Sequence, residues 1–359
     1  MTTTNRIRFL LPILSPLIAI ASALIVGAIL ISLAGANAIA AYTALFQESL
    51  FTYFGFGNTL TKMTPLLFTS LGVLVGLRAG QFNIGGEGQI YLGALGSALI
   101  GLYLQGLPGL IHVPLALLAG FLFGAVWGWI PGYLKAVRGV NEVITTLLLN
   151  YIAINLVSYL VQNPLKAPTA PSPYSPLIAK SAQLPIILPG SLAHAGILLG
   201  LIAAGILWVL LVRSPLGYQI AAVGFNPIAA RYAGISVERT IMLVMALAGG
   251  LAGLAGATEV MGLKYRLFEQ VSPGYGFDAI AIAFLSRGSV FGVILTSLFF
   301  AALRSGANVM QRSAGVPVTV VYAIQGLTVL FIAISLAVER QIRVETQRGG
   351  SALRGFPPL

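Results

Sequence analysis

The chain has 359 residues, of which 57% are hydrophobic and only 8% are charged. Soluble domains carry roughly 25% charged residues, so a water-soluble fold could not cover this much apolar surface. The net charge of +11 would suggest nucleic acid in a soluble protein, but in a membrane protein it is better explained by basic loops, and we expect no nucleic-acid partner. The chain has no cysteine, which excludes disulfides, thiolate catalysis and cysteine-based metal sites.

Apolar runs recur along the whole sequence, and each is about as long as the 20 residues that cross a bilayer as a helix. They lack the alternation of polar and apolar residues that is typical of a membrane barrel. We therefore predict an all-α, polytopic transmembrane helical bundle that forms a single domain over residues 1–359. The first run lacks a small-residue cleavage site and is longer than a signal peptide, so it is predicted to be a retained span. About ten spans are expected, near residues 10–35, 58–79, 84–104, 112–134, 141–162, 193–213, 240–262, 276–286, 289–308 and 316–338.

The distribution of basic residues predicts the orientation. With the N-terminus in the cytoplasm, thirteen of the twenty Lys and Arg residues are cytoplasmic, and Arg304 lies within a span. This excess predicts that both termini, including a tail over residues 339–359, face the cytoplasm. The six cations expected outside are Lys62, Lys166, Lys180, Lys264, Arg266 and Arg312.

Residues 163–191 are rich in proline and serine and are predicted to form an external loop between the fifth and sixth spans. Two functions are open for this loop. It could be a linker that joins two halves of one bundle, or it could lie near a partner that delivers the solute.

Two segments depart from plain spanning helices. Residues 82–89 are polar and rich in glycine where a span should begin, and residues 272–278 precede an apolar stretch of about eleven residues, which as a helix covers only about 16 Å. Each segment begins the second element of a four-span half. The halves, spans two to five and seven to ten, are therefore predicted to form an inverted repeat, a common plan of transporters with broken helices.

Residues 213–239 connect the sixth and seventh predicted spans, on the side predicted to be cytoplasmic. Asn226 suits a helix N-cap, Pro227 the first helical position, and Gly234 the left-handed residue after the last turn. Ser214 and Pro215 repeat the same start signal upstream. The sequence therefore predicts short helices here, which must contact either lipid headgroups or another protein.

Ionisable residues at membrane depth are costly and rarely face lipid. Glu87 and Glu142 are candidates for holding helix ends or for a part in transport. Asp278 is expected to cap the short eighth helix or to line the transport route, and Arg304 is expected to pair with an acid inside the bundle. The ionisable set is Glu87, Glu142, Glu259, Asp278 and Arg304.

Polar uncharged residues within the spans have two possible functions, hydrogen bonding between helices or contact with a solute that has aromatic faces and amide edges. These candidates are Asn83, Tyr91, Asn150, Asn308, Tyr322 and Gln325.

Motifs of catalysis and nucleotide binding are missing. The glycine-rich loop ending in Lys and Ser or Thr that holds ATP phosphates does not occur. The two histidines, His112 and His194, are far apart in sequence, are expected at the membrane interface, and predict no metal site. We therefore expect neither an enzyme nor a cofactor bound by this chain.

Four segments resemble the permeases of bacterial ABC importers in the branched-chain amino acid and simple-sugar class, and above all their nucleoside-type branch. They are residues 82–89, 141–146, 224–235 and 276–281, and together they span most of residues 65–335. The resemblance implies uptake of nucleosides, with simple sugars or branched-chain amino acids as the alternative. An ion-coupled secondary carrier, with Glu259 or Asp278 as its ion site, is the alternative from another class.

The resemblance also implies partners and a location. It implies a second permease subunit, cytoplasmic ATPase subunits that bind ATP and Mg, an external solute-binding protein, and a multi-pass position in the bilayer of a bacterial inner (plasma) membrane. Residues 214–238 would then be the coupling helices that dock on the ATPase. The residues that carry this expectation are Gly224, Asn226, Pro227, Ala230, Arg231, Tyr232 and Gly234.

Overall fold

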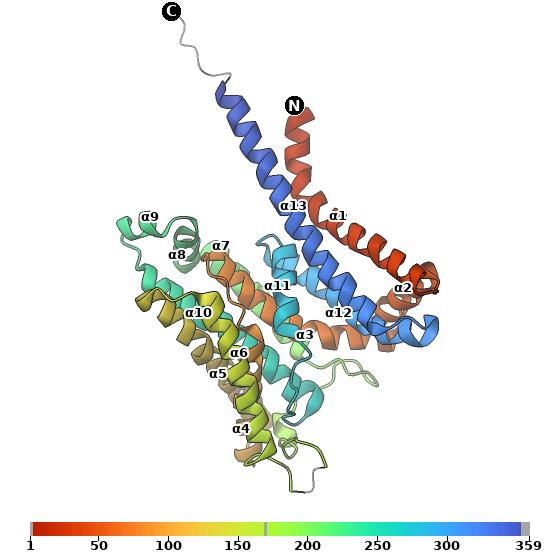
Figure 1. The fold of residues 1–359 in the computed structure, drawn as a ribbon. Coiled ribbons are helices and arrows are strands. Elements are labelled where there is room, and N and C mark those ends of the chain that lie inside the picture. Colours follow the sequence, from red (N-terminus) through yellow and green to blue (C-terminus); the bar gives the residue numbers. More distant parts are fainter. Residues whose placement is uncertain (1–2, 169–170, 353–359) are drawn as a thin grey trace, which may run out of the picture. The chain divides into compact units, whose positions relative to one another are not determined.

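In a computed structural model of the chain, residues 3–168 and 171–352 are described, with side chains over residues 17–168 and 171–335. These residues fold into thirteen α-helices, and no β-strand occurs among them (Figure 1). The predicted all-α, polytopic bundle is thereby confirmed. The chain divides into two compact units, Gln47–Ser305 and the combination of Met1–Phe46 with Gly306–Leu359.

The larger unit holds most of the long helices. It also contains two π-helical turns: one at Gln47–Phe51 precedes α3, and one at Glu259–Lys264 follows α10. The helices of this unit are α3 (Tyr53–Arg78), α4 (Gly86–Tyr103), α5 (Gly109–Arg138), α6 (Glu142–Gln162), α7 (Gly196–Arg213), α8 (Pro215–Phe225), α9 (Pro227–Tyr232), α10 (Val237–Thr258), α11 (Tyr275–Leu285) and the first part of α12 (Val290–Ala314).

Helix α10 lies at the centre of the larger unit and packs against α3, α4 and α5. Glycines allow its close approach to α5: a Cβ on Gly124 would overlap the backbone of Gly249 and Gly253, and a Cβ on Gly253 would overlap Gly120 O. Small residues spaced by four along facing helices are typical of packing within membranes, where close backbone contact replaces the hydrophobic effect.

The smaller unit holds α1 (Thr3–Leu33), α2 (Ala38–Phe46), the end of α12 and α13 (Val318–Ala352). Helix α1 packs along α13. Helix α2 was not among the predicted elements; Asn37 caps it by accepting from Ile39 N (3.0 Å) and Ala40 N (3.1 Å). Residues 353–359 of the predicted tail lie outside the described residues.

Seven helices of the described chain are long and apolar enough to cross a membrane. The other three predicted spans correspond to α4 and to the shorter apolar helices Leu17–Leu33 and Tyr275–Leu285, so the number of ten crossings stays a prediction. The seven are Tyr53–Arg78, Gly109–Arg138, Glu142–Gln162, Gly196–Arg213, Val237–Lys264, Val290–Ala314 and Val318–Ser335.

The long loop between α6 and α7 packs onto the larger unit. Its backbone N–H groups donate to the segment that follows α10: Ile178 N to Tyr265 O (2.9 Å) and Leu184 N to Met261 O (2.8 Å). The loop also contains a 3-10 turn at Lys180–Ala182. These hydrogen bonds hold the loop against the segment that follows α10.

Candidate functional site

Residues 214–238 form two short helices between α7 and α10 (Figure 1). The Ser214 hydroxyl accepts from Gly217 N (3.1 Å), with Pro215 at the first helical position of α8. Asn226 Oδ1 accepts from Ile228 N (3.0 Å) and Ala229 N (3.1 Å) at the start of α9, which Pro227 begins. These caps confirm the helices that the sequence predicted.

A left-handed glycine ends the second short helix. Gly234 has φ +83°, a conformation that only glycine adopts without strain. The chain then turns into α10, where Glu238 in the first turn pairs with Arg231 of α9. Arg231 therefore fixes α9 against α10, at an ion pair that is open to solvent.

Inward and outward faces of α9 differ sharply. Ala230 is only 3% exposed and packs in a cluster with Val223 and Met245. By contrast, Tyr232 at the end of α9 and Phe225, the last residue of α8, are each 90% exposed. Large aromatic side chains so open to their surroundings are typical of a surface that meets lipid headgroups or a protein.

Gly224 brings α8 against the end of α3, because a Cβ at this position would overlap Arg78 O. Arg78 in turn donates from Nη2 to Gly288 O (2.6 Å) in the turn between α11 and α12. The end of α8 is therefore connected, through one turn of backbone and one side chain, to the end of the short helix α11.

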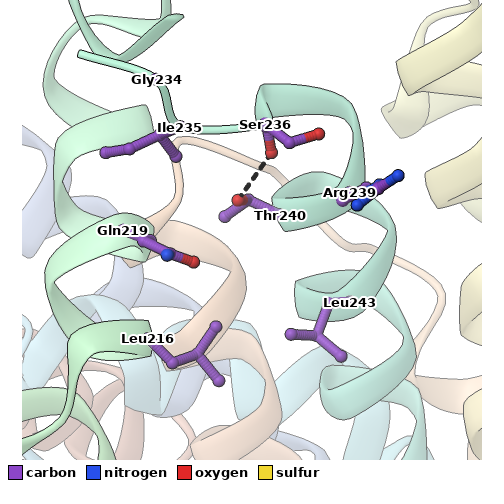
Figure 2. Close-up of a pocket in the computed structure, with 8 residues that line it drawn as sticks. All are labelled: Leu216, Gln219, Gly234, Ile235, Ser236, Arg239, Thr240 and Leu243. Carbon is purple, nitrogen blue, oxygen red and sulfur yellow. Dashed lines mark hydrogen bonds between the residues drawn. The ribbon is translucent and has the colours of Figure 1, made fainter.

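A half-open pocket of about 290 Å³ lies beside the contact between α8 and α10. Figure 2 shows Leu216 and Gln219 of α8 on one wall and Leu243 of α10 on the other, with Gly234 to Ser236 at the connecting turn. The Thr240 hydroxyl donates to Ser236 O (2.9 Å). The lining combines apolar and polar side chains.

The two glycine-rich segments that the sequence singled out meet within the larger unit. The carboxylate of Glu87, in the first turn of α4, accepts from Gly276 N (2.7 Å) and Gly274 N (3.2 Å) at the start of α11. Glu87 is only 4% exposed. A carboxylate is favourable at the N-terminus of a helix, where unpaired N–H groups and the helix dipole are positive. Glu87 thus lies in the first turn of its own helix and accepts hydrogen bonds from the start of another, α11.

Asp278 does not cap α11, and that prediction was wrong. Glu87 and the Ser272 hydroxyl, which accepts from Tyr275 N (3.0 Å), take the free N–H groups of this helix. Asp278 instead accepts from Arg304 Nε of α12 (2.6 Å). Arg304 is thus paired with an acid, as expected, and this attraction offsets part of the cost of burying both charges.

Lys62 was expected outside the membrane, at the start of a span from residue 58. Helix α3 begins at Tyr53 instead, so Lys62 lies about two turns within it and donates from Nζ to Arg304 O (2.9 Å). Glu259 is 2% exposed at the start of the π-helical turn of α10. Lys62 and Ser272 were not among the predicted site residues, and the signal that could have found Ser272 is its place in the irregular segment 272–278.

Asn83 and Asn150 stabilise the irregular start of α4. Asn83 Oδ1 accepts from Gly85 N (2.8 Å), and Asn150 of α6 both accepts from Gly88 N (2.8 Å) and donates to Ile84 O (2.9 Å). For these two residues the hydrogen bonds match the alternative of bonding within the bundle. Tyr91, in the second turn of α4, is 3% exposed.

The remaining candidates are dispersed. Glu142 forms an ion pair with Lys135 (2.8 Å), while Asn141 caps α6 by accepting from Val143 N (2.9 Å). In the smaller unit, Asn308 is exposed, Tyr322 is 49% exposed and Gln325 is buried. The described structure therefore gathers Glu87, Asp278 and Arg304 around α11, and leaves Glu142 at a helix end.

Comparison with known proteins gives relatives over most of the chain. A guanosine ABC transporter permease protein, NupP of Bacillus subtilis, is 37% identical and covers 91% of this chain and 94% of its own. A glucose ABC transporter permease protein, TsgB13 of Haloferax volcanii, is 37% identical over 89% of this chain and 87% of its own. A nucleoside ABC transporter permease protein, NupB of Lactococcus lactis, is 35% identical over 91% and 92%.

No solved structure matches the chain. Two more distant relatives come from the same organisms: a second guanosine permease of Bacillus subtilis is 26% identical to this chain, and a second nucleoside permease of Lactococcus lactis is 27% identical. Residues 55–333 match the family described as branched-chain amino acid transport system / permease component. With this match and relatives of similar length, the chain belongs to that family of ABC transporter permeases.

Proposed function

We propose that this chain is the permease subunit of an ATP-driven importer of nucleosides. The observation that carries the proposal is its likeness over about nine tenths of the chain to two permeases described as guanosine and nucleoside transporters. Simple-sugar uptake is the second candidate, because a glucose permease is equally similar. The chain moves solute across the bilayer and breaks no bond.

Energy comes from a partner in this proposal. ATP and Mg are bound by separate cytoplasmic ATPase subunits, and an external solute-binding protein delivers the nucleoside. A second permease subunit completes the route, and the two permease relatives in each of two organisms favour a pair of different chains. The location is a bacterial inner membrane, with both termini and residues 214–238 in the cytoplasm.

Residues 214–238 dock on the ATPase through their outward face, and the contacts of Gly224 supply a route for the motion. The ATPase pushes on Phe225 and Tyr232, which are open to a partner. The resulting movement of α8 displaces the end of α3, which Gly224 contacts. Arg78 at that end is hydrogen-bonded to Gly288 beside α11, so the movement reaches α11. Because Glu87 and Arg304 hold the other end of α11, a displacement at one end would tilt this short helix within the bundle.

Uptake of labelled guanosine tests the function. Cells that express the chain with its partners should take up guanosine, lose this uptake when ATP is depleted, and lose it to excess unlabelled nucleoside but not to glucose. Competition by glucose alone would keep the ATP-driven mechanism and change the substrate. Uptake that continues without ATP and follows a proton or sodium gradient would favour the ion-coupled carrier and overturn the mechanism.

A further inference from the structure

Helices α5, α6 and α7 are the spans of the larger unit that expose most of their surface, and their exposed faces differ. Between residues 114 and 129, the exposed residues of α5 are Pro, Leu, Phe, Val and Trp; between residues 198 and 212, those of α7 are Leu, Ile, Gly, Val and Trp. These faces suit contact with lipid tails. Helix α6 exposes a line of polar side chains in its second half, beside the exposed Ile152 and Leu156.

The polar side chains of α6 follow one face. Their spacing of three or four residues places them in line along the helix, and Tyr151 and Tyr159 are each 61% exposed. The face covers the half of α6 that leads to the long loop, about 16 Å at 1.5 Å per residue. We call it the α6 polar face, and it consists of Tyr151, Asn155, Ser158, Tyr159 and Gln162.

The α6 polar face is costly against lipid and continuous with polar groups at one end. Asn155 lies seven residues from Gln162, the last residue of α6, about 10 Å inside the helix end. An amide at this depth needs water, protein or solute as a partner. Toward the loop, Ser158 Oγ (2.6 Å) and Gln162 Nε2 (2.8 Å) both donate to the carboxylate of Glu269. In the other direction the face ends, since Leu148 and Ile144 follow and are exposed.

We propose that the α6 polar face lines the aqueous entrance of the transport route and that Tyr151 and Asn155 contact the base of the incoming nucleoside. This inference rests on the proposed function. A tyrosine ring stacks on a nucleobase through its face, and an amide both donates to and accepts from the edge of a base. The Asn155 nitrogen donates to Tyr151 O (2.7 Å), which fixes the amide beside the ring and leaves its oxygen and second proton for the base.

The absence of native cysteine makes a labelling experiment direct. Asn155→Cys and the control Ile202→Cys are expressed with the full transporter in permeabilised cells and treated with a cationic thiosulfonate. Ile202 is 58% exposed and lies six residues from Gly196, the first residue of α7, at the end joined to α6 by the same loop. Because only the thiolate reacts, and it forms in water and not in lipid, Asn155→Cys should be labelled at least about tenfold faster.

Solute protection separates the parts of the inference. Guanosine should slow the labelling of Asn155→Cys severalfold, while labelling of Ile202→Cys should not change. Equal rates for the two variants, in a transporter that still imports guanosine, would overturn the inference and leave the proposed function standing. Fast labelling that no nucleoside slows would overturn the base contact. Protection by glucose alone would keep the lining assignment but refute both nucleoside contact and nucleoside transport.

Transport kinetics give a second readout. Tyr151→Leu should raise the KM for guanosine about fivefold or more with the protein still inserted in the membrane, whereas Tyr151→Phe should keep it near the wild-type value because the ring remains. The matched control is Trp208→Leu on α7, an exposed aromatic (47%) that should not change KM. An unchanged KM in Tyr151→Leu would overturn the assignment of Tyr151.

Discussion

The side chains of Asp278 and Arg304 join α11 to α12, with Arg304 Nε 2.6 Å from Asp278 Oδ2. Arg304 also donates from Nη2 to Pro273 O (3.2 Å) and lies over the Tyr275 ring, 5.1 Å from its centroid. One buried guanidinium thus contacts the start of α11 at three residues. Helix α11 is too short to cross the bilayer by itself, so we expect its position to depend on these contacts of the Arg304 guanidinium.

Removing one partner of this ion pair should destabilise the protein more than removing both. Arg304→Met leaves an uncompensated Asp278 carboxylate, and Asp278→Leu leaves an uncompensated guanidinium. Each single change should cost about 3–5 kcal/mol, while the double variant should recover part of this loss. Thermal unfolding of the detergent-purified complex is the measurement. If the double variant loses as much stability as the two single variants added together, the two side chains do not stabilise each other and the ion-pair interpretation is wrong.

The close packing of α5 on α10 makes a second prediction. Gly124→Leu should destabilise the larger unit by at least about 1–3 kcal/mol, because its side chain would have to displace the backbone of α10. Gly205→Leu on α7 is the matched control, since a Cβ at Gly205 meets nothing within 4 Å. Both variants add the same side chain to a spanning helix. Similar yields and unfolding temperatures for the two variants would show that the glycine contact is not needed.

The exposed face of α9 gives a third prediction. Tyr232→Asp should reduce guanosine uptake tenfold or more while the purified chain keeps its unfolding temperature, because Tyr232 is 90% exposed and belongs to the docking surface that we propose for the ATPase. Tyr232→Phe should retain uptake. ATPase activity and co-purification of the ATPase subunits are measured on the same samples. Normal uptake in Tyr232→Asp would remove Tyr232 from the docking surface.

Because Ala230 is buried, a charged substitution at this position tests the folding of α9 and not the docking surface. Because Ala230 packs against Val223 and Met245, Ala230→Asp places a carboxylate in an apolar cluster and should unfold α9 itself. Loss of uptake in that variant would accompany a lower unfolding temperature. The comparison with Tyr232→Asp therefore distinguishes loss of the docking surface from loss of the helix that carries it.

Sequence reasoning predicted local features well. The short helix α9 could be located because its cap, its proline and its terminal glycine lie within nine residues, and each acts on its own backbone. The contact of Glu87 with Gly276 could not, because the two residues are 189 positions apart and meet only through the packing of α4 on α11. Asp278 was misassigned for the same reason. Its place near the start of a helix suggested a cap, whereas its pairing with Arg304 of α12 depends on the packing of two helices.

His194 is a buried titratable residue outside the spanning helices. It lies in the loop before α7 and is only 1% exposed. Its Nδ1 accepts from Gly196 N (3.1 Å), so the neutral ring carries its proton on Nε2. Burial lowers the pKa of His194 from 6.5 to about 4, since removal from water disfavours the charged imidazolium.

This pKa shift predicts loss of stability in mild acid. The unfolded chain binds a proton at His194 below about pH 6.5, whereas the folded protein does so only below about pH 4, so the contribution of His194 is present above pH 6.5 and falls as the pH drops through this window. The loss should reach about 3 kcal/mol. In His194→Asn an amide oxygen can accept from Gly196 N without titrating, so the unfolding temperature should fall less between pH 7 and pH 4.5 than in the wild type. Equal slopes in the two proteins would show that His194 is protonated without cost in the folded state.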